Sequence, residues 1–178
     1  MTEGLPFAHS YNLARLGNAG DEVRLAADPA QRAAIAKWAG LLGVEKWDAR
    51  VKIKKLASNR FGLNFHLAAD VIQSCVVSLE PVPGHLERDF SREFIFVGTS
   101  RHRPAETESE TVLDIAEEEG PEEIESLHVD LAAPVLEEFT LALDPYPRRP
   151  GAEFTPQIEP SDGSESPFAA LKALKPGG

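Results

Sequence analysis

The sequence predicts an α+β fold in which two helices pack on a curved antiparallel β-sheet, with closure into a barrel as one variant. Residues 50–97 alternate apolar and polar side chains, which is the period of strands with one buried face. Residues 28–43 and 130–143 instead place apolar side chains at helical spacing. We therefore expect one domain over residues 1–147 and a flexible tail over residues 148–178.

The first helix is predicted over residues 28–43 because both ends carry boundary signals. Asp28 can cap the first turn, Pro29 suits the first helical position, and Gln31 stands three residues after the cap. Gly43 follows the last apolar position and marks the expected end. The face toward the sheet would carry Ala34, Ile35, Trp38, Leu41 and Leu42.

Two strands are predicted next, over residues 50–56 and 60–79. The first alternates aliphatic with basic residues, and the second has its apolar residues at odd positions. A bend near residues 69–70 would divide the second strand in two. Cys75 lies on the apolar parity, and Gln73 is a polar exception whose side chain could satisfy backbone groups at such a bend.

The segment 81–84, Pro-Val-Pro-Gly, is predicted to be the turn that ends this strand, because proline cannot continue a central ladder. A third long strand follows over residues 85–98, with its apolar residues at even positions and two arginines among them. Within the acidic stretch of residues 101–126, only residues 111–116 have the composition of a strand. The rest of that stretch is predicted to be a solvated loop.

The second helix is predicted over residues 130–143, with Asp130 as its cap and Pro134 in its first turn. Its apolar face would carry Ala132, Leu136, Phe139 and Leu143. Within the tail, residues 166–175 have the apolar spacing of a short amphipathic helix that could dock on the domain or on a partner.

Charge is distributed unevenly along the chain, whose formal net charge is −11. Residues 1–60 carry ten Lys and Arg against six Asp and Glu, whereas residues 106–178 carry four against eighteen. The acidic part would repel nucleic-acid phosphates and attract a basic partner over about 8 Å, the Debye length at physiological salt. No apolar run approaches the length of a membrane span and the N-terminus lacks a signal-peptide pattern, so we expect a cytoplasmic protein.

Cys75 is the only cysteine. A catalytic thiol needs exposure, a lowered pKa and a partnering base, but no catalytic signature surrounds Cys75 and its strand parity favours a small buried side chain. One thiolate cannot build a multi-cysteine zinc site, and the five histidines lack metal-ligand spacing. No phosphate-binding loop or dinucleotide motif is present. The sequence therefore predicts no enzymatic activity, cofactor, metal site or small-molecule substrate.

Two charged segments are candidates for binding. A basic strand could follow the phosphates of RNA, or its side chains could simply be a solvated sheet face that discourages edge pairing. Its residues are Arg50, Lys52, Lys54, Lys55 and Arg60. An acidic segment could bind a basic partner or be a solvated charge run. Its residues are Glu117, Glu118, Glu119, Glu122, Glu123 and Glu125.

Several short motifs follow one another in a specific order. They begin with Gln-Ser-Cys and Leu-Glu-Pro, continue with the second helix and a proline pair, and end with Ser-Pro-Phe. The positions concerned are Gln73, Cys75, Glu80, Pro81, Asp130, Glu137, Glu138, Pro145, Pro147, Pro167 and Phe168. In this order they resemble the YceD-like family of large ribosomal RNA subunit accumulation proteins over most of residues 10–175.

The resemblance implies a non-enzymatic factor in large-subunit biogenesis, whose loss lowers 23S rRNA. Its implied partner is a ribosomal protein, with L32 as one candidate, or pre-rRNA. Many members of the family carry a Cys-x-x-Cys pair where this chain has Ile72 and Cys75, so a zinc or redox role suspected for those members does not transfer. The alternatives are an acidic chaperone-like module for a basic protein outside ribosome assembly and, less favoured, a Cys75-dependent enzyme.

Overall fold

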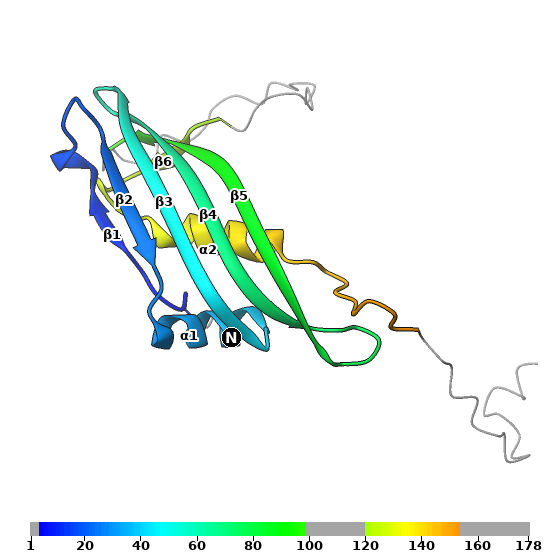
Figure 1. Ribbon diagram of the computed structural model, residues 1–178. Coiled ribbons are helices and arrows are strands. Elements are labelled where there is room, and N and C mark those ends of the chain that lie inside the picture. Colours follow the sequence, from blue (N-terminus) through cyan, green and yellow to red (C-terminus); the bar gives the residue numbers. More distant parts are fainter. Residues whose placement is uncertain (1–3, 99–119, 154–178) are drawn as a thin grey trace, which may run out of the picture.

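Long antiparallel strands form the centre of the structure, a computed structural model that describes residues 4–98 and 120–153 (Figure 1). Within these residues one sheet has the order β2-β3-β4-β5-β6, and a second sheet pairs β1 with β7. The elements are β1 (Ser10–Asn12), a 3-10 turn (Leu13–Arg15), β2 (Asp21–Ala26), α1 (Pro29–Ala39), β3 (Gly43–Ala57), β4 (Arg60–Ser74), β5 (Pro81–Phe96), β6 (Glu122–Ile124), β7 (His128–Asp130) and α2 (Ala132–Ala142). The predicted α+β class is therefore confirmed.

The central hairpin of β3 and β4 is longer at its start than the sequence predicted. β3 begins at Gly43 rather than near Arg50, and its pairing with β4 shifts between Val44 and Lys46. This bulge changes the parity, so the buried Trp47 lies three residues after the buried Val44. A strict period of two therefore missed the beginning of the strand, residues 43–49.

The alternation predicted for β4 is confirmed, because every odd position from Phe61 to Val71 is buried. Pairing with β5 runs without a register shift from Arg60 to Ser74, so β4 itself has no bulge near residues 69–70. The strand ends at Ser74, earlier than predicted. Cys75 is fully buried, but it begins the turn that follows the strand.

The predicted turn at residues 81–84 is wrong, since Pro81 begins β5 and Pro83 pairs with Ile72 of β4. Within the described residues, β5 pairs on its other side only at Phe94–Phe96. Its first half is therefore an edge, where a proline that lacks an N–H group can be accommodated. The chain instead turns between Cys75 and Glu80, and the Cys75 N–H donates to the Glu80 carbonyl at 2.9 Å.

The sheet is mixed rather than wholly antiparallel, and it does not close into a barrel. β6 lies inside the stretch predicted to be a loop, and it pairs with the end of β5 in parallel. The strand predicted at residues 111–116 and the helix predicted at residues 166–175 lie outside the described residues. β1, β2 and β7 were not predicted.

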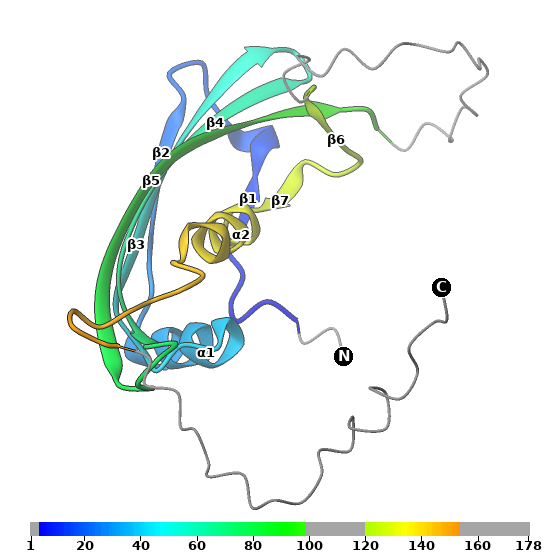
Figure 2. The same ribbon diagram turned by 90° about the vertical axis from the view of Figure 1, so that its right-hand side faces the viewer.

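Both helices lie on the same side of the large sheet, which we call its inner face (Figure 2). α1 has the predicted capping box between Asp28 and Gln31, but it ends at Gly40 rather than Gly43. Gly40 adopts a left-handed conformation, with φ of 68°, that terminates the helix. α2 begins after Leu131, while the carboxylate of the predicted cap, Asp130, still accepts a hydrogen bond from the Ala132 N–H at 2.9 Å.

The core lies between the inner face and the helices. Its largest fully buried side chains include Trp47, Ile53, Leu63 and Phe139. The Phe65 and Phe90 rings stack across β4 and β5 at 4.6 Å, and Phe7 packs edge-on against Trp47. The even-position apolar face predicted for β5 is thus part of the core.

Gly20 allows the turn before β2 to approach the backbone of β3. It has φ of +80°, and a Cβ added there would lie 2.7 Å from the Ile53 carbonyl oxygen, whereas one added at Gly17 would meet nothing within 4 Å. We expect Gly20→Ala to lower the free energy of unfolding by at least about 1–2 kcal/mol, the usual cost of left-handed backbone. Gly17→Ala is the control and should stay within about 0.5 kcal/mol. Urea denaturation followed by circular dichroism tests this, and equal effects of the two variants would contradict it.

Candidate functional site

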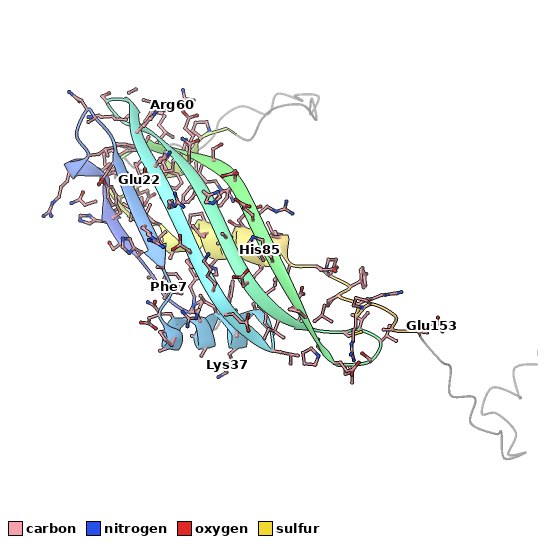
Figure 3. All side chains as sticks on the ribbon, viewed as in Figure 1. Phe7, Glu22, Lys37, Arg60, His85 and Glu153 are labelled. Atoms are coloured by element: carbon pink, nitrogen blue, oxygen red, sulfur yellow. The ribbon has the colours of Figure 1, made fainter. Side chains whose placement is uncertain are left out.

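Four of the five side chains of the predicted basic strand lie on the outer face of the large sheet, which points away from the helices. Figure 3 labels one of them, Arg60, near one end of the sheet. Cross-strand pairing places Arg50, Lys52 and Lys54 together on this exposed face. The paired outer positions hold six basic and six acidic residues: Arg24, Lys46, Arg50, Lys52, Lys54 and Arg60, with Glu22, Asp48, Asp70, Glu87, Asp89 and Glu93. The formal charge of these positions therefore sums to zero.

Ion pairs also link the basic strand to its neighbours. Arg60 contacts Glu93 at 2.7 Å, and Arg24 of β2 contacts Asp48 at 2.6 Å. Lys55 pairs with the buried Phe61, so it stands on the opposite parity from Lys52. The structure thus brings three of the five predicted basic residues into one exposed row and engages Arg60 with an acidic neighbour.

The predicted acidic segment is only partly described. Glu117, Glu118 and Glu119 lie outside the described residues. Glu122 and Glu123 lie in β6, and Glu125 follows that strand; all three are exposed. Of these, Glu122 and Glu125 line a groove beside α2.

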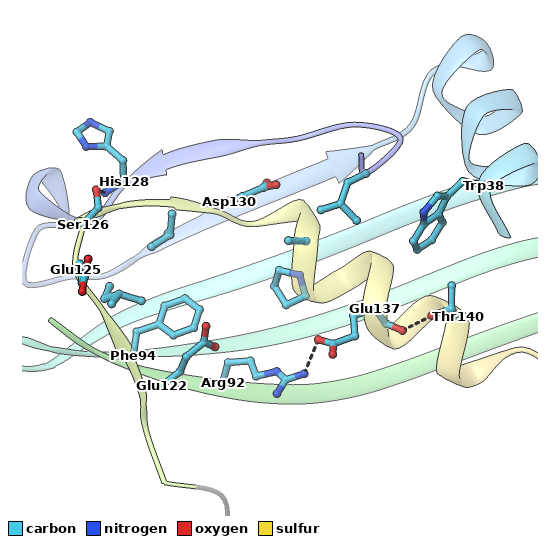
Figure 4. A pocket seen from close by; sticks show the side chains of 15 residues that line it. Trp38, Arg92, Phe94, Glu122, Glu125, Ser126, His128, Asp130, Glu137 and Thr140 are labelled. Atoms are coloured by element: carbon cyan, nitrogen blue, oxygen red, sulfur yellow. Dashed lines mark hydrogen bonds and ion pairs between the residues drawn. The ribbon is translucent and has the colours of Figure 1, made fainter. Parts of the chain in front are cut away.

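This groove, which we call the β6–α2 groove, has a volume of about 990 Å³ and lies beside α2 (Figure 4). Its apolar lining includes Trp38 from α1, Phe94 from β5, Ile124 from β6 and Pro134 from α2. Its charged lining consists of four carboxylates and one guanidinium: Glu122, Glu125, Asp130, Glu137 and Arg92. The imidazole of His128 lines it as well. The groove is therefore apolar and acidic together.

Two of these carboxylates have fixed local roles. Asp130 accepts hydrogen bonds from the His9 N–H at 2.7 Å and the Ala132 N–H at 2.9 Å, and so joins the N-terminal segment to the start of α2. Arg92 reaches from the inner face of β5 to Glu137 of α2 at 3.0 Å. This contact explains how an arginine is accommodated on the otherwise apolar parity of β5.

Hydrogen-bond donors surround the Cys75 thiol. Its Sγ accepts from the backbone N–H groups of Val77, Ser78 and Arg149, each at 3.4 Å. A hydrogen bond from the Ser78 side chain, with those from the Arg149 and Ser78 backbone, lowers the pKa of Cys75 to about 6, although burial opposes the shift. Among the described residues, no histidine forms a hydrogen bond with this sulfur.

Residues of the sequence motifs meet around this turn. The Gln73 side chain donates to the Asp144 carbonyl at 2.8 Å, and the Val76 N–H donates to the Pro147 carbonyl at 2.9 Å. Arg149 pairs with Glu80, and its guanidinium lowers the pKa of that carboxyl. Gln73 therefore holds the segment after α2, instead of satisfying a bulge as the sequence suggested. We call this cluster of residues 73–80 and 144–149 the terminal joint.

The remaining motif positions are spread out. Pro81 begins β5, Glu137 faces the β6–α2 groove, and Glu138 is half-buried on α2. Pro145 and Pro147 flank the exposed Tyr146 in the terminal joint. Pro167 and Phe168 lie outside the described residues. The order of these residues in the sequence identified them as family markers. It did not indicate that the motif around Gln73 and Cys75 contacts the proline pair that follows α2.

Residues 4–98 and 120–153 lack two kinds of feature. No group of three or more His, Cys, Asp and Glu side chains there could hold a metal ion. No helix there is long and apolar enough to cross a membrane.

Comparison with models of known families shows to which family the chain belongs. Residues 63–175, more than half of the chain, match the family model of the large ribosomal RNA subunit accumulation protein YceD. The chain therefore belongs to the YceD family, and membership implies a role in accumulation of large-subunit rRNA. No curated protein and no solved structure gives a significant match. The matched region contains the terminal joint and the whole of α2.

The Cys75 environment predicts a measurable thiol titration. Because Ser78 contributes the largest lowering of the pKa, Ser78→Ala should move the titration midpoint above the wild-type value of about 6. Ser74→Ala is the matched control, since the Ser74 hydroxyl donates to the Leu79 carbonyl and should leave the midpoint unchanged. Ultraviolet absorbance of the thiolate measures both.

The lowered pKa of Cys75 also makes the stability of the fold depend on pH. A thiol whose pKa is lowered in the folded protein stabilises it fully above the unfolded pKa of about 8.5, and this contribution disappears as pH falls through about 6. Stability relative to Cys75→Ala should therefore rise between those values. A wild-type midpoint near the ordinary thiol value would contradict the assignment of these donors.

Proposed function

We propose that the protein supports large-subunit rRNA accumulation by binding a basic ribosomal protein in the cytoplasm, without enzymatic chemistry. Family membership supplies the link to large-subunit rRNA. Residues 106–178 carry eighteen acidic against four basic residues, and such a surface attracts and steers a lysine-rich protein. Shielding the partner until rRNA is available is the simplest way for such binding to aid assembly.

The contrast between the two faces of the sheet carries this proposal. On the outer face the row of basic residues is balanced by acidic neighbours, so its potential toward a phosphate chain is weak. The β6–α2 groove, in contrast, presents four carboxylates against one guanidinium. A protein with this distribution favours a cationic partner over RNA.

The non-enzymatic part of the proposal rests on Cys75. Its thiol is fully buried, and the described structure places backbone N–H donors and a serine against it, which suits a structural role in the turn. Low pKa alone does not make a catalytic cysteine when the sulfur is inaccessible. Cofactors and small-molecule substrates are not part of the proposed function.

Two other partners remain as alternatives. Pre-rRNA is favoured by one observation, the exposed row of Arg50, Lys52 and Lys54. A basic protein outside ribosome assembly would suit the same acidic surface, because the electrostatic argument does not depend on the identity of the partner. The ribosomal protein L32 is one specific candidate that the affinity experiment below can identify.

Depletion of the protein from cells should lower the ratio of 23S to 16S rRNA. Wild-type protein and Cys75→Ser should restore the ratio equally, because the thiol has no proposed chemical role. Affinity purification from the restored cells should recover a basic large-subunit protein under ribonuclease treatment. An unchanged ratio on depletion would overturn the proposed function, and failure of Cys75→Ser alone would restore the enzyme alternative.

The pre-rRNA alternative is tested at the exposed row of basic residues on β3. If the protein binds a basic protein instead of RNA, this row should not affect retention of RNA. We expect charge reversal at Arg50, Lys52 and Lys54 to leave retention of 23S rRNA fragments unchanged in a gel shift at fixed salt. Lys55→Glu, on the opposite parity, is the matched control for a change of charge near this strand. Loss of retention in the triple variant, with Lys55→Glu unaffected, would favour direct binding of RNA.

A further inference from the structure

We propose that the β6–α2 groove binds an extended segment of the basic partner in which Lys or Arg side chains flank one aromatic or large aliphatic side chain. The inference rests on the proposed function and deepens it, because it names the surface and the chemistry of the segment. It combines three observations on the groove: its carboxylates, its apolar floor and the edge of β6 with which no strand of residues 4–98 or 120–153 pairs.

The carboxylates supply the attraction for cations. Glu122 and Glu125 are exposed at one end of the groove, and neither forms an ion pair with any residue in 4–98 or 120–153. Glu137 lies further along α2 (Figure 4). Cationic side chains spaced along a segment could therefore meet separate carboxylates along the groove.

The floor supplies the contact for an apolar side chain. Phe94 is buried at the end near Glu122, and Trp38 is half-buried at the opposite end, near Thr140 (Figure 4). Pro134 of α2 also lines the groove. An aromatic or large aliphatic side chain can bury its surface against these rings, and the stems of lysine and arginine can pack there as well.

The strand edge favours an extended segment. β6 pairs with β5 on one side, and among the described residues no strand pairs with its other side. Its free backbone N–H and C=O groups can pair with an added strand, while alternate side chains of that strand face the groove. A groove of about 990 Å³ is also at the upper end of the size of small-molecule pockets, which favours a peptide as occupant.

Replacing Arg92 should change the affinity for the segment in the opposite direction from replacing the carboxylates. Its guanidinium contacts Glu137 at 3.0 Å and is the only Lys or Arg side chain that lines the groove in the described residues. A cationic segment has to compete with it for Glu137. Replacing Arg92 with Gln should therefore tighten binding of the segment, while replacing the carboxylates weakens it.

The test uses the full chain and three labelled synthetic decapeptides. The first alternates Lys and Ser around one central Phe, the second has Ala in place of Phe, and the third has Glu in place of every Lys. We expect the full chain to bind the first peptide most tightly in fluorescence anisotropy and to bind the third not at all. The triple variant Glu122→Gln, Glu125→Gln, Glu137→Gln should weaken binding of the first peptide about tenfold.

Two controls separate the groove from charge in general. Glu22→Gln, Glu45→Gln, Glu87→Gln changes the net charge equally at residues that do not line the groove, and it should alter affinity less than about twofold. Arg92→Gln should tighten binding about threefold, and Trp38→Ala should weaken the Phe peptide while leaving the Ala peptide unchanged. Circular dichroism confirms that each variant is folded before its affinity is measured.

The outcomes separate the two proposals. Equal weakening by the two triple variants, or equal binding of the Phe and Ala peptides, would overturn the groove proposal but would leave binding of a basic protein intact. Absence of binding to any lysine peptide would also overturn it. The proposed function is tested separately, by the 23S to 16S ratio after depletion and by the affinity purification, and neither measurement uses these peptides.

Discussion

The antiparallel pairing of β3 with β4 is the constraint on which the rest of the structure depends. Its register sets which side chains form the inner face, and a slip of one residue would expose Phe65 and Leu67 and bury Asn64 and His66. Both helices need that apolar inner face to pack on. β5 then extends the register to its last residues, where β6 joins. The groove therefore exists only when this register is correct.

Regular elements could be predicted from the sequence, and irregular ones could not. β4 was predicted because its apolar odd positions alternate with residues such as Asn64 and His66, and the start of α1 because Asp28 and Gln31 form a local capping box. The beginning of β3 was missed because a bulge changes its parity, and the beginning of β5 because an edge position accommodates Pro83. Bulges and edges depend on neighbouring strands, so the local pattern does not show them.

In the candidate site, too, local features could be predicted from the sequence and features that depend on long-range strand pairing could not. Strand parity placed Arg50, Lys52 and Lys54 on one exposed face, but it could not show that Asp89 and Glu93 lie two strands away on the same face. The acidic residues of 122–125 were recognised by composition alone. Their position beside α2 follows from the parallel pairing of β6 and the contact of β7 with β1. These are long-range pairings, for which a short acidic strand carries no local signal.

The terminal joint connects the family motifs to the groove. Gln73 and Val76 hold the backbone at Asp144 and Pro147, directly after α2, and Arg149 returns to Glu80 and to the Cys75 sulfur. These bonds fix the C-terminal end of α2, and the same helix carries Glu137 and Pro134 along the groove. Residues at the far end of the sheet therefore hold the end of a helix that lines the proposed binding surface, although they do not line that surface themselves. Cys75 serves this arrangement as a buried hydrogen-bond acceptor, which explains how the motif can be structural while the proposed binding takes place elsewhere.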